Sequence, residues 1–571
     1  MIFDSKHDET LPVIDAFKKA TLLDFNSRRS TVYSTHGMVA TSQPLAAQAG
    51  IDILKRGGNA ADAAVATAAC LNITEPCSTG IGGDAFCLYY SAKDKKVYAL
   101  NGSGKSPKDL SYDELIASIP ENSKEIPVDS PHSVTVPGAA AAMIDTVKNF
   151  GSGKLSLSEI FDRAVDLADN GYPVEALAAM QWERSVKLLK KASPNAEDML
   201  LNGKAPKEGE IIRMPHLART YREVGENGHD AFYKGRIAKE IVKVVAERGG
   251  KLSLEDLSNH KSEFCEPISI NYEGVDVYEC PPNGQGIVAL MALGMVEELQ
   301  KSEKINRLEH MEHNGVEYLH ALIECTRIAF ADARFHVTDP DFSKVKAAHL
   351  LDKEYLKKRA ELFDPSKANV NPDVGAPISY SNTVYLTTVD EEGNACSFIM
   401  SNYMGFGSGI IPKECGFTLQ NRGCNFFLDP KTTNCYAPGK RPYHTIIPAM
   451  ALKDNELYMS FGVMGGFMQP QGHLQVVLGM EHFNFSPQTA LDKPRFSILP
   501  EDGLVLIEDG IEDEVVEGLI KLGHKVEVTK DYLRMNFGRG QVIRSHKDKN
   551  TGVRVLSGGS DGRADGMAIG Y

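Results

Sequence analysis

Two runs rich in apolar, β-branched and aromatic residues flank a short polar turn near position 390. The runs cover 384–389 and 395–400, and residues of these kinds favour strands. Between them lies Asp-Glu-Glu-Gly-Asn at 390–394, in which Gly and Asn tolerate turn geometry. The pattern predicts a β-hairpin that begins at Thr383.

The residues before this hairpin read as a loop. Asp364-Pro365-Ser366 and the stretch 371–377 contain Pro, Gly and Asn, which interrupt regular structure. Two interpretations follow. The segment is either an ordinary loop that enters a hairpin, or a loop that presents Thr383 as a nucleophile once the chain is cut between Asn382 and Thr383.

Periodic apolar positions place helices in the first half of the chain. From 43 to 71 small and apolar residues recur at helical spacing, with an interruption at Gly57-Gly58, which predicts two packed helices. A glycine run, 80–83, then precedes a strand-like segment at 85–90. Such a run fits either close packing or an anion cradle.

The coarse pattern changes along the chain. Residues 155–365 are mostly helical in pattern, and the sequence from 383 onward is rich in strand signals. This distribution predicts an α+β layered fold with sheets covered by helices. In the middle segment His320 and Glu324 lie four residues apart, so they fit either a core-edge pair or two metal ligands. Without a third ligand nearby, no metal is expected.

Composition narrows the class of protein. Of 571 residues, 42% are hydrophobic and 24% charged, which is typical of soluble globular proteins, and no apolar run is long enough for a membrane helix. The net charge of −14 and the lack of basic runs argue against nucleic acid as a partner. Ten scattered cysteines and a polar start without a signal-like apolar region favour reduced thiols and a cytoplasmic location.

Several short motifs occur in a fixed order along the chain. They are Gly-Met-Val-Ala at 37–40, Gly-Gly-Asn-Ala-Ala-Asp at 57–62, Gly-Ile-Gly-Gly at 80–83, Val-Pro-Gly at 136–138, Gly-Lys-Arg-Pro at 439–442, Met-Gly-Gly at 464–466 and the final Gly-Tyr. In this order they resemble the γ-glutamyltranspeptidase (glutathione hydrolase) family of N-terminal nucleophile hydrolases, and especially its γ-glutamyltranspeptidase-like branch. The resemblance runs from about position 37 to 571. It implies a four-layer αββα sandwich and a proenzyme that cuts itself into a large chain, 1–382, and a small chain, 383–571, which then pair.

The resemblance also implies a mechanism. Thr383 attacks the carbonyl of Asn382, and hydrolysis of the resulting ester frees the Thr383 amine as a base. The N–H groups of Gly465 and Gly466 then serve as the oxyanion hole, and Asn402 aligns with a family asparagine near the nucleophile.

Two positions depart from the family pattern for binding a substrate zwitterion. Ser103 stands where the family has an arginine for the substrate carboxylate, and Asn425 stands where it has an aspartate for the ammonium group. These changes remove charge-assisted contacts.

The remaining substrate-binding candidates follow from the same alignment. Thr445 corresponds to one of two family serines that hold the substrate, and His444 replaces the other. Arg422 and Lys105 are cations that could meet a substrate carboxylate from another direction or form ordinary salt bridges.

Three functions are therefore compared. The first is an autoprocessed amidohydrolase or acyltransferase that cleaves a γ-glutamyl or related small acid amide without a cofactor. The second is a true glutathione hydrolase and γ-glutamyltransferase, which Ser103 and Asn425 argue against. The third is an unprocessed, non-catalytic binding protein.

Overall fold

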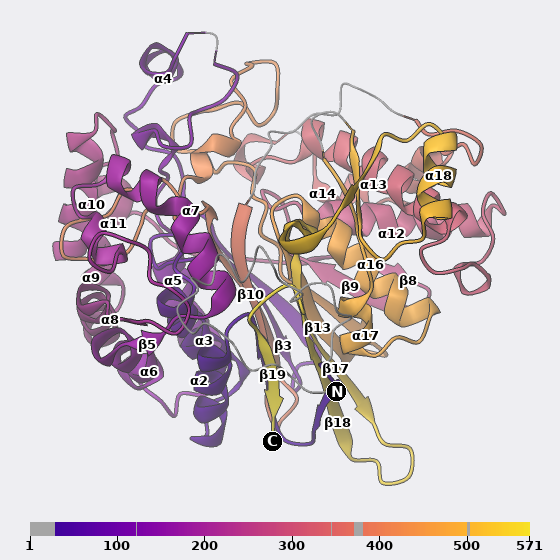
Figure 1. The fold of residues 1–571 in the computed structure, drawn as a ribbon, viewed down its shortest axis with the longest axis horizontal. Helices are drawn as coiled ribbons and strands as arrows, with labels where there is room; N and C mark the ends of the chain where they lie inside the picture. The colour runs from indigo at the N-terminus through magenta and orange to yellow at the C-terminus, as the bar shows by residue number, and fades with distance from the viewer. Residues whose placement is uncertain (1–28, 122, 344, 370–380, 500–502) are drawn as a thin grey trace, which may run out of the picture.

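Two seven-stranded antiparallel sheets stack face to face at the centre of the molecule, and helices cover their outer faces (Figure 1). The computed structural model describes residues 29–121, 123–343, 345–369, 381–499 and 503–571. In spatial order, the first sheet contains β1 (Val32–Ser34), β18 (Arg554–Ser560), β17 (Arg539–Lys547), β13 (Glu456–Met464), β12 (Ala449–Lys453), β9 (Val275–Glu279) and β8 (Ile268–Tyr272). The second contains β19 (Met567–Gly570), β2 (Met38–Thr41), β10 (Ser381–Val389), β11 (Ala395–Met404), β3 (Asp84–Ser91), β4 (Lys96–Gly102) and β7 (Glu263–Cys265).

The strand alternation explains the layers. Phe86 and Tyr385 of the second sheet point inward and pack with Ile543 of the first sheet in the core between the sheets. Because successive strand residues face opposite sides, their neighbours Cys87 and Leu386 instead join the core beneath the helices. Both faces of the second sheet are therefore buried at its centre, which explains why β3 and β11 carry apolar residues on both faces.

One helical layer packs on the outer face of the second sheet. Its first two members are α2 and α3, and the side chain of Asn59 caps α3 by accepting hydrogen bonds from the N–H groups of Ala61 and Asp62. This layer and the helices attached to it are α2 (Pro44–Lys55), α3 (Ala60–Thr74), α4 (Tyr112–Ser118), α5 (Ala139–Phe150), α6 (Leu157–Asn170), α7 (Ala176–Ala192), α8 (Pro215–Asn227), α9 (His229–Tyr233), α10 (Arg236–Glu247) and α11 (Leu254–Ser258).

The other helical layer packs on the first sheet, where it closes a separate apolar core. Its helices are α12 (Gly286–Lys301), α13 (Val316–His336), α14 (Ala347–Leu350), α15 (Lys353–Ala360), α16 (Met468–His482), α17 (Pro487–Asp492) and α18 (Asp513–Lys521). Short strands lie outside the two main sheets: β5 (Tyr172–Pro173), β6 (Ile211–Ile212), β14 (Phe496–Ile498), β15 (Val505–Glu508) and β16 (Val526–Thr529). The result is the αββα sandwich expected from the sequence.

The segments before and after position 383 are interleaved in both sheets. In the second sheet, β10 and β11 lie between β2 and β3, and in the first sheet β12 lies between β13 and β9. Neither segment could keep these sheets without the other, because each would expose unpaired strand edges. If the chain is cut before Thr383, the two fragments are therefore expected to stay together.

The structure confirms the predicted hairpin and the two packed helices at the start of the chain. The stretch 155–365 is mostly helical, as expected, but it also supplies the short strands β7, β8 and β9 to the two main sheets. Of the predicted loop before the hairpin, residues 370–380 lie outside the described residues.

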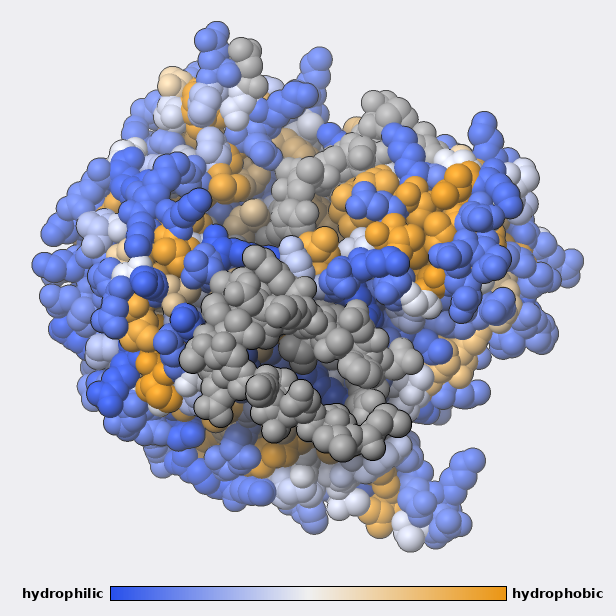
Figure 2. All heavy atoms as spheres, in the orientation of Figure 1, coloured by the Kyte–Doolittle hydropathy of each residue, from blue (hydrophilic) through white to orange (hydrophobic). Residues whose placement is uncertain are grey.

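The visible surface is mostly hydrophilic, with a hydrophobic group at the upper right, over the region of α13 and α18 (Figure 2). Among the described residues, no helix is long and apolar enough to span a bilayer.

Candidate active site

Thr383 lies near the start of β10, at an irregularity in the sheet. Asn382 pairs with Tyr403, but Val384 pairs with Met400, so the register with β11 shifts at Thr383. Such bulges redirect a side chain. The fully buried Thr383 hydroxyl donates a hydrogen bond of 3.2 Å to Ser401 Oγ. The side chain of Asn382 lies outside the described part of the structure.

An arginine from the neighbouring sheet holds the backbone of Thr383. Arg539 Nη2 donates to the carbonyl oxygen of Thr383 at 3.3 Å, and Nη1 pairs with Glu75 Oε1 at 2.7 Å. Glu75 in turn accepts hydrogen bonds from the hydroxyls of Ser42 and Ser78. Charge-assisted contacts of this kind fix geometry strongly, so Thr383 is positioned from both its side chain and its main chain.

Arg422 lies one contact beyond the Thr383 hydroxyl. It belongs to the 3₁₀ turn η5 (Arg422–Asn425) and is fully buried. Its Nη2 donates to Ser401 Oγ at 3.2 Å, its Nη1 donates to Thr445 Oγ1 at 2.7 Å, and its guanidinium lies 4.5 Å from the ring centre of Tyr403. Burial lowers the pKa of Arg422 to about 10. The guanidinium is therefore a buried cation surrounded by hydroxyls and an aromatic ring.

The Gly465–Gly466 loop follows β13 and has the backbone geometry that glycine alone adopts easily. The φ angles are 136° at Gly465 and 56° at Gly466. Among the described residues, the N–H groups of both glycines enter no hydrogen bond. Gln285 Nε2 donates to the carbonyls of Gly466 and Thr445, which connects this loop to the Arg422 side of the site.

Asn402 packs against the glycine run at 80–83. Its Nδ2 donates to Thr418 Oγ1 at 3.3 Å, whereas its Oδ1 has no hydrogen-bond partner among the described residues. A Cβ added at Gly83 would lie 2.7 Å from Asn402 Oδ1, so the glycine is required for close packing. Of the two interpretations of the glycine run, this geometry supports close packing.

His444 forms a buried pair with Asp84, the first residue of β3. His444 Nε2 lies 3.1 Å from Asp84 Oδ2, and both residues are fully buried. The backbone N–H groups of Gly104 and Gly138 both donate to Asp84 Oδ1 at 3.2 Å. Burial raises the pKa of Asp84 to about 7, although Arg422 opposes this rise, and burial holds the pKa of His444 well below its usual value.

The other substrate-binding candidates have different surroundings. Ser103 is buried, and its hydroxyl donates to Asn101 Oδ1 at 2.7 Å and accepts from Asn283 Nδ2 at 3.2 Å. Asn425 Nδ2 donates to the carbonyl of Tyr443, and its Oδ1 has no partner among the described residues.

Lys105 differs from these buried candidates. It lies at the surface, with Nζ 3.4 Å from Asp341 Oδ2. Salt bridges this exposed contribute little to stability or binding, so its geometry matches an ordinary surface pair.

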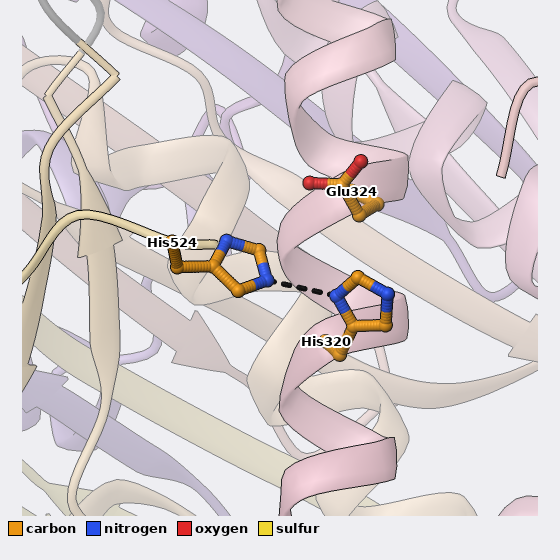
Figure 3. Close-up of side chains that lie close together, drawn as sticks. All are labelled: His320, Glu324 and His524. Atoms are coloured by element: carbon orange, nitrogen blue, oxygen red, sulfur yellow. Dashed lines mark hydrogen bonds between the residues drawn. The ribbon is translucent and has the colours of Figure 1, made fainter. Parts of the chain in front are cut away.

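The structure brings a third residue, His524, to the pair at 320 and 324, contrary to the expectation that no further ligand lay nearby (Figure 3). Arg327 Nη1 can only donate, so its 3.0 Å contact makes His524 Nδ1 an acceptor and places the His524 proton on Nε2. That proton points to His320 Nδ1 at 2.8 Å.

The rest of this cluster is hydrogen-bonded as well. His320 Nε2 lies 2.8 Å from the carbonyl of Asp364, and Glu324 accepts from Arg327 and from the N–H of Asn369. The three candidate ligands thus already have partners, and a cation lies among them. This pattern describes a buried anchor that ties the chain at 364–369 to α13 rather than a metal site.

Comparison with known proteins identifies the family. The γ-glutamyltranspeptidase family profile matches residues 46–571. The chain belongs to the γ-glutamyltranspeptidase family. It is 35% identical to the glutathione hydrolase-like YwrD proenzyme of Bacillus subtilis, over 95% of this chain and 99% of that protein. It is 30% identical to the oxamate amidohydrolase proenzyme of Klebsiella pneumoniae, over 95% of this chain and 100% of that protein.

A solved structure extends this comparison to the fold. The cephalosporin acylase from Bacillus halodurans is 40% identical, with a TM-score of 0.86, and the match covers 100% of this chain and 99% of that one. Membership in the γ-glutamyltranspeptidase family makes the protein an enzyme of the hydrolase and acyltransferase type. The relatives' names differ in substrate, so the family does not determine what this enzyme cleaves.

Several residues of the site escaped the sequence analysis. Ser401, Asp84, Glu75 and Arg539 are polar and at least nine-tenths buried, yet each comes from a segment whose pattern reads as strand, helix end or loop. Asp84 directly follows the glycine run at 80–83, and this position was the strongest sequence signal that any of the four residues belongs to a site. The other three become recognisable only when the fold brings distant segments together.

Proposed function

We propose that the protein is an autoprocessed amidohydrolase whose nucleophile is Thr383, released as an N-terminal residue by cleavage after Asn382. The observation that carries this proposal is the buried hydroxyl of Thr383, located at a bulge and directed at Ser401 Oγ at 3.2 Å. The support from the family is that its curated relatives are proenzymes.

The chemistry needs only groups of the chain itself. In the precursor, the Thr383 hydroxyl attacks the carbonyl carbon of Asn382, the peptide bond shifts to an ester, and water hydrolyses the ester. The freed α-amine titrates near pH ~8 and accepts the hydroxyl proton when Thr383 attacks a substrate amide. That proton passes to the leaving amine, and water or an acceptor amine resolves the acyl ester.

The Gly465–Gly466 loop is proposed as the oxyanion hole. Its two N–H groups are free of hydrogen bonds within the described part of the chain, which is the state that a donor to a transient oxyanion needs. Removal of one such donor typically costs about 3 kcal/mol of barrier, or a hundredfold in rate. The proposed substrate is a small acid amide. Glutathione hydrolysis is the alternative, and the neutral Ser103 and Asn425 argue against it.

The test is the mass of the purified protein under denaturing conditions. The wild type should give two fragments that meet at the bond between Asn382 and Thr383, and Thr383→Ala should give one chain. Thr387→Ala is a matched control, because Thr387 is also a buried threonine of β10 and donates to Ser460 Oγ. This control should be cut like the wild type.

A single uncut chain in the wild type would overturn the proposal and favour the non-catalytic binding protein. Native mass measurement of the cut protein should still give the mass of both fragments together, because they share two sheets.

A further inference from the structure

Arg422 is a buried cation that contacts no carboxylate in the described part of the protein, although the charge of nearby Asp84 acts on it. It forms no ion pair among the described residues, and its Nε has no hydrogen-bond partner there. Its contacts are the hydroxyls of Ser401 and Thr445 and the face of Tyr403. A buried charge that no counter-charge contacts is costly, so a site of this kind is suited to an anion that arrives from outside.

The neighbouring groups that could hold a second anion are already occupied by the protein's own carboxylate. Asp84 takes the N–H groups of Gly104 and Gly138 and the contact of His444. Gly104, one of these donors, directly follows Ser103, the position at which the family has an arginine, and the Ser103 hydroxyl is itself bonded to Asn101 and Asn283. The polar groups near this position thus already have partners within the protein, which leaves Arg422 as the available receptor.

Among the described residues, the site also offers no carboxylate that is free to receive a substrate ammonium group. Asn425, at the family's aspartate position, is neutral, and Asp84 is saturated by its three donors. Arg422 itself is close to the reaction centre, because Ser401 Oγ links its Nη2 to Thr383 Oγ1 through two hydrogen bonds of 3.2 Å. The anion and the scissile carbonyl of the substrate must therefore lie only a few bonds apart.

From this arrangement we propose that Arg422 binds the carboxylate of a short dicarboxylic acid monoamide that carries no amino group, with at most two carbon atoms between its two carbonyl carbons. The inference rests on the proposed function and specifies its substrate class. The Thr383 oxygen forms the ester bond to the amide carbon, the C–N bond breaks, and the amine leaves with the hydroxyl proton. Water then splits the ester, which regenerates Thr383 and releases the dicarboxylic acid.

The experiment measures ammonia release from a series of amides, on protein whose cleavage into two fragments has first been verified by mass. The series is oxamate, malonamate, succinamate and glutaramate, with butyramide as a neutral amide and L-glutamine as a γ-glutamyl amide. We expect kcat/KM to be highest within the first three. The Arg422→Gln variant should lose about 100-fold or more on these three and less than about tenfold on butyramide.

Two further arms keep the test independent of how well Arg422→Gln folds or matures. Oxalate, malonate and succinate should inhibit the wild type competitively, and acetamide should not. Arg56→Gln is the matched control, because Arg56 is a half-exposed arginine whose partner Glu159 is also at the surface. It should keep the wild-type profile.

The outcomes separate the two proposals. Two fragments with the expected preference and its loss in Arg422→Gln support the inference. Two fragments with a preference for L-glutamine, glutaramate or butyramide overturn it but leave the Thr383 amidohydrolase in place. A chain that stays uncut overturns the proposed function itself.

Discussion

A buried cluster that contains two arginines and the single buried Arg422 have opposite surroundings in this protein. The paired cluster consists of Arg495, Arg563, Asp561 and Glu508, in which Asp561 contacts Arg495 at 2.8 Å and Arg563 at 2.9 Å. Although burial lowers it, the two carboxylates raise the pKa of Arg563 above its usual value. Arg422 is equally buried but has hydroxyl partners, and burial lowers its pKa to about 10.

The difference separates a structural role from a binding role. In the paired cluster the protein neutralises its own charges, so a ligand would gain nothing there. At Arg422 the cost of burying the charge is not offset by a carboxylate contact. This guanidinium is linked to Thr383 through the hydroxyl of Ser401. The contrast predicts that changes in the paired cluster affect stability, whereas changes around Arg422 affect substrate use.

The largest expected effect is the loss of amide hydrolysis in Thr383→Ala, without a loss of folding. Thr383→Ala should lower amide hydrolysis by at least about 1,000-fold, because the nucleophile is removed. The measurement is ammonia release from the best amide of the series. The uncut chain should remain folded by circular dichroism. Retained activity would show that Thr383 is not the nucleophile.

The next effect concerns stability. In the Thr383→Ala background, where every variant remains one chain, Arg563→Gln should lower the free energy of unfolding by about 3–5 kcal/mol, since it leaves Asp561 and Glu508 short of a partner. Urea unfolding measures this loss. As a control, Asp230→Asn removes an exposed partner of Lys234 and should cost less than about 1 kcal/mol. Equal costs would contradict the structural role of the cluster.

Local sequence patterns were enough for part of this structure. The hairpin around 390 and the paired helices at 44–74 follow from side-chain periodicity and turn residues, which are properties of neighbouring residues. The strands β7 to β9 were missed because they are short and embedded in a segment with helical periodicity. β8 and β9 form a local hairpin, whereas β7 and β9 also pair with β4 and β12, which lie far away in the sequence.

In the candidate site, too, some residues were predictable from local sequence and others were not. Thr383, the two glycines and Arg422 were found from motifs, whereas the contact between Asp84 and His444 joins positions 360 residues apart. A similar separation concealed His524 from the pair at 320 and 324. No local pattern encodes such contacts, because the fold alone brings the partners together.

A smaller stability effect sharpens the comparison of Arg422 with the paired cluster. In the same Thr383→Ala background, Arg422→Gln should change the free energy of unfolding by no more than about 1 kcal/mol, because the lost hydrogen bonds are offset by relief of an unpaired buried charge. Urea unfolding beside Arg563→Gln gives a matched pair of arginine substitutions. A loss at Arg422 as large as that at Arg563 would assign both residues to the framework.

The smallest expected effect is a pH dependence that joins Asp84 to Arg422. Burial raises the pKa of Asp84 from 3.8 to about 7, with Arg422 opposing the rise. As the pH falls from 8 to 6 Asp84 becomes protonated, so its negative charge no longer offsets Arg422. The KM for a carboxylate substrate should then fall by about threefold.

The same shift has a defined sign for folding. A carboxyl group with a raised pKa in the folded protein favours folding at a pH below 3.8, and this contribution is lost as the pH rises to about 7. Asp84→Asn should flatten both profiles between these limits, while butyramide, which has no carboxylate, should show no such change in KM in either protein. If the KM of Asp84→Asn for a carboxylate substrate still varied with pH as in the wild type, the charge of Asp84 would have no effect on substrate binding at Arg422. The role of Asp84 would then be confined to holding Gly104, Gly138 and His444 in place.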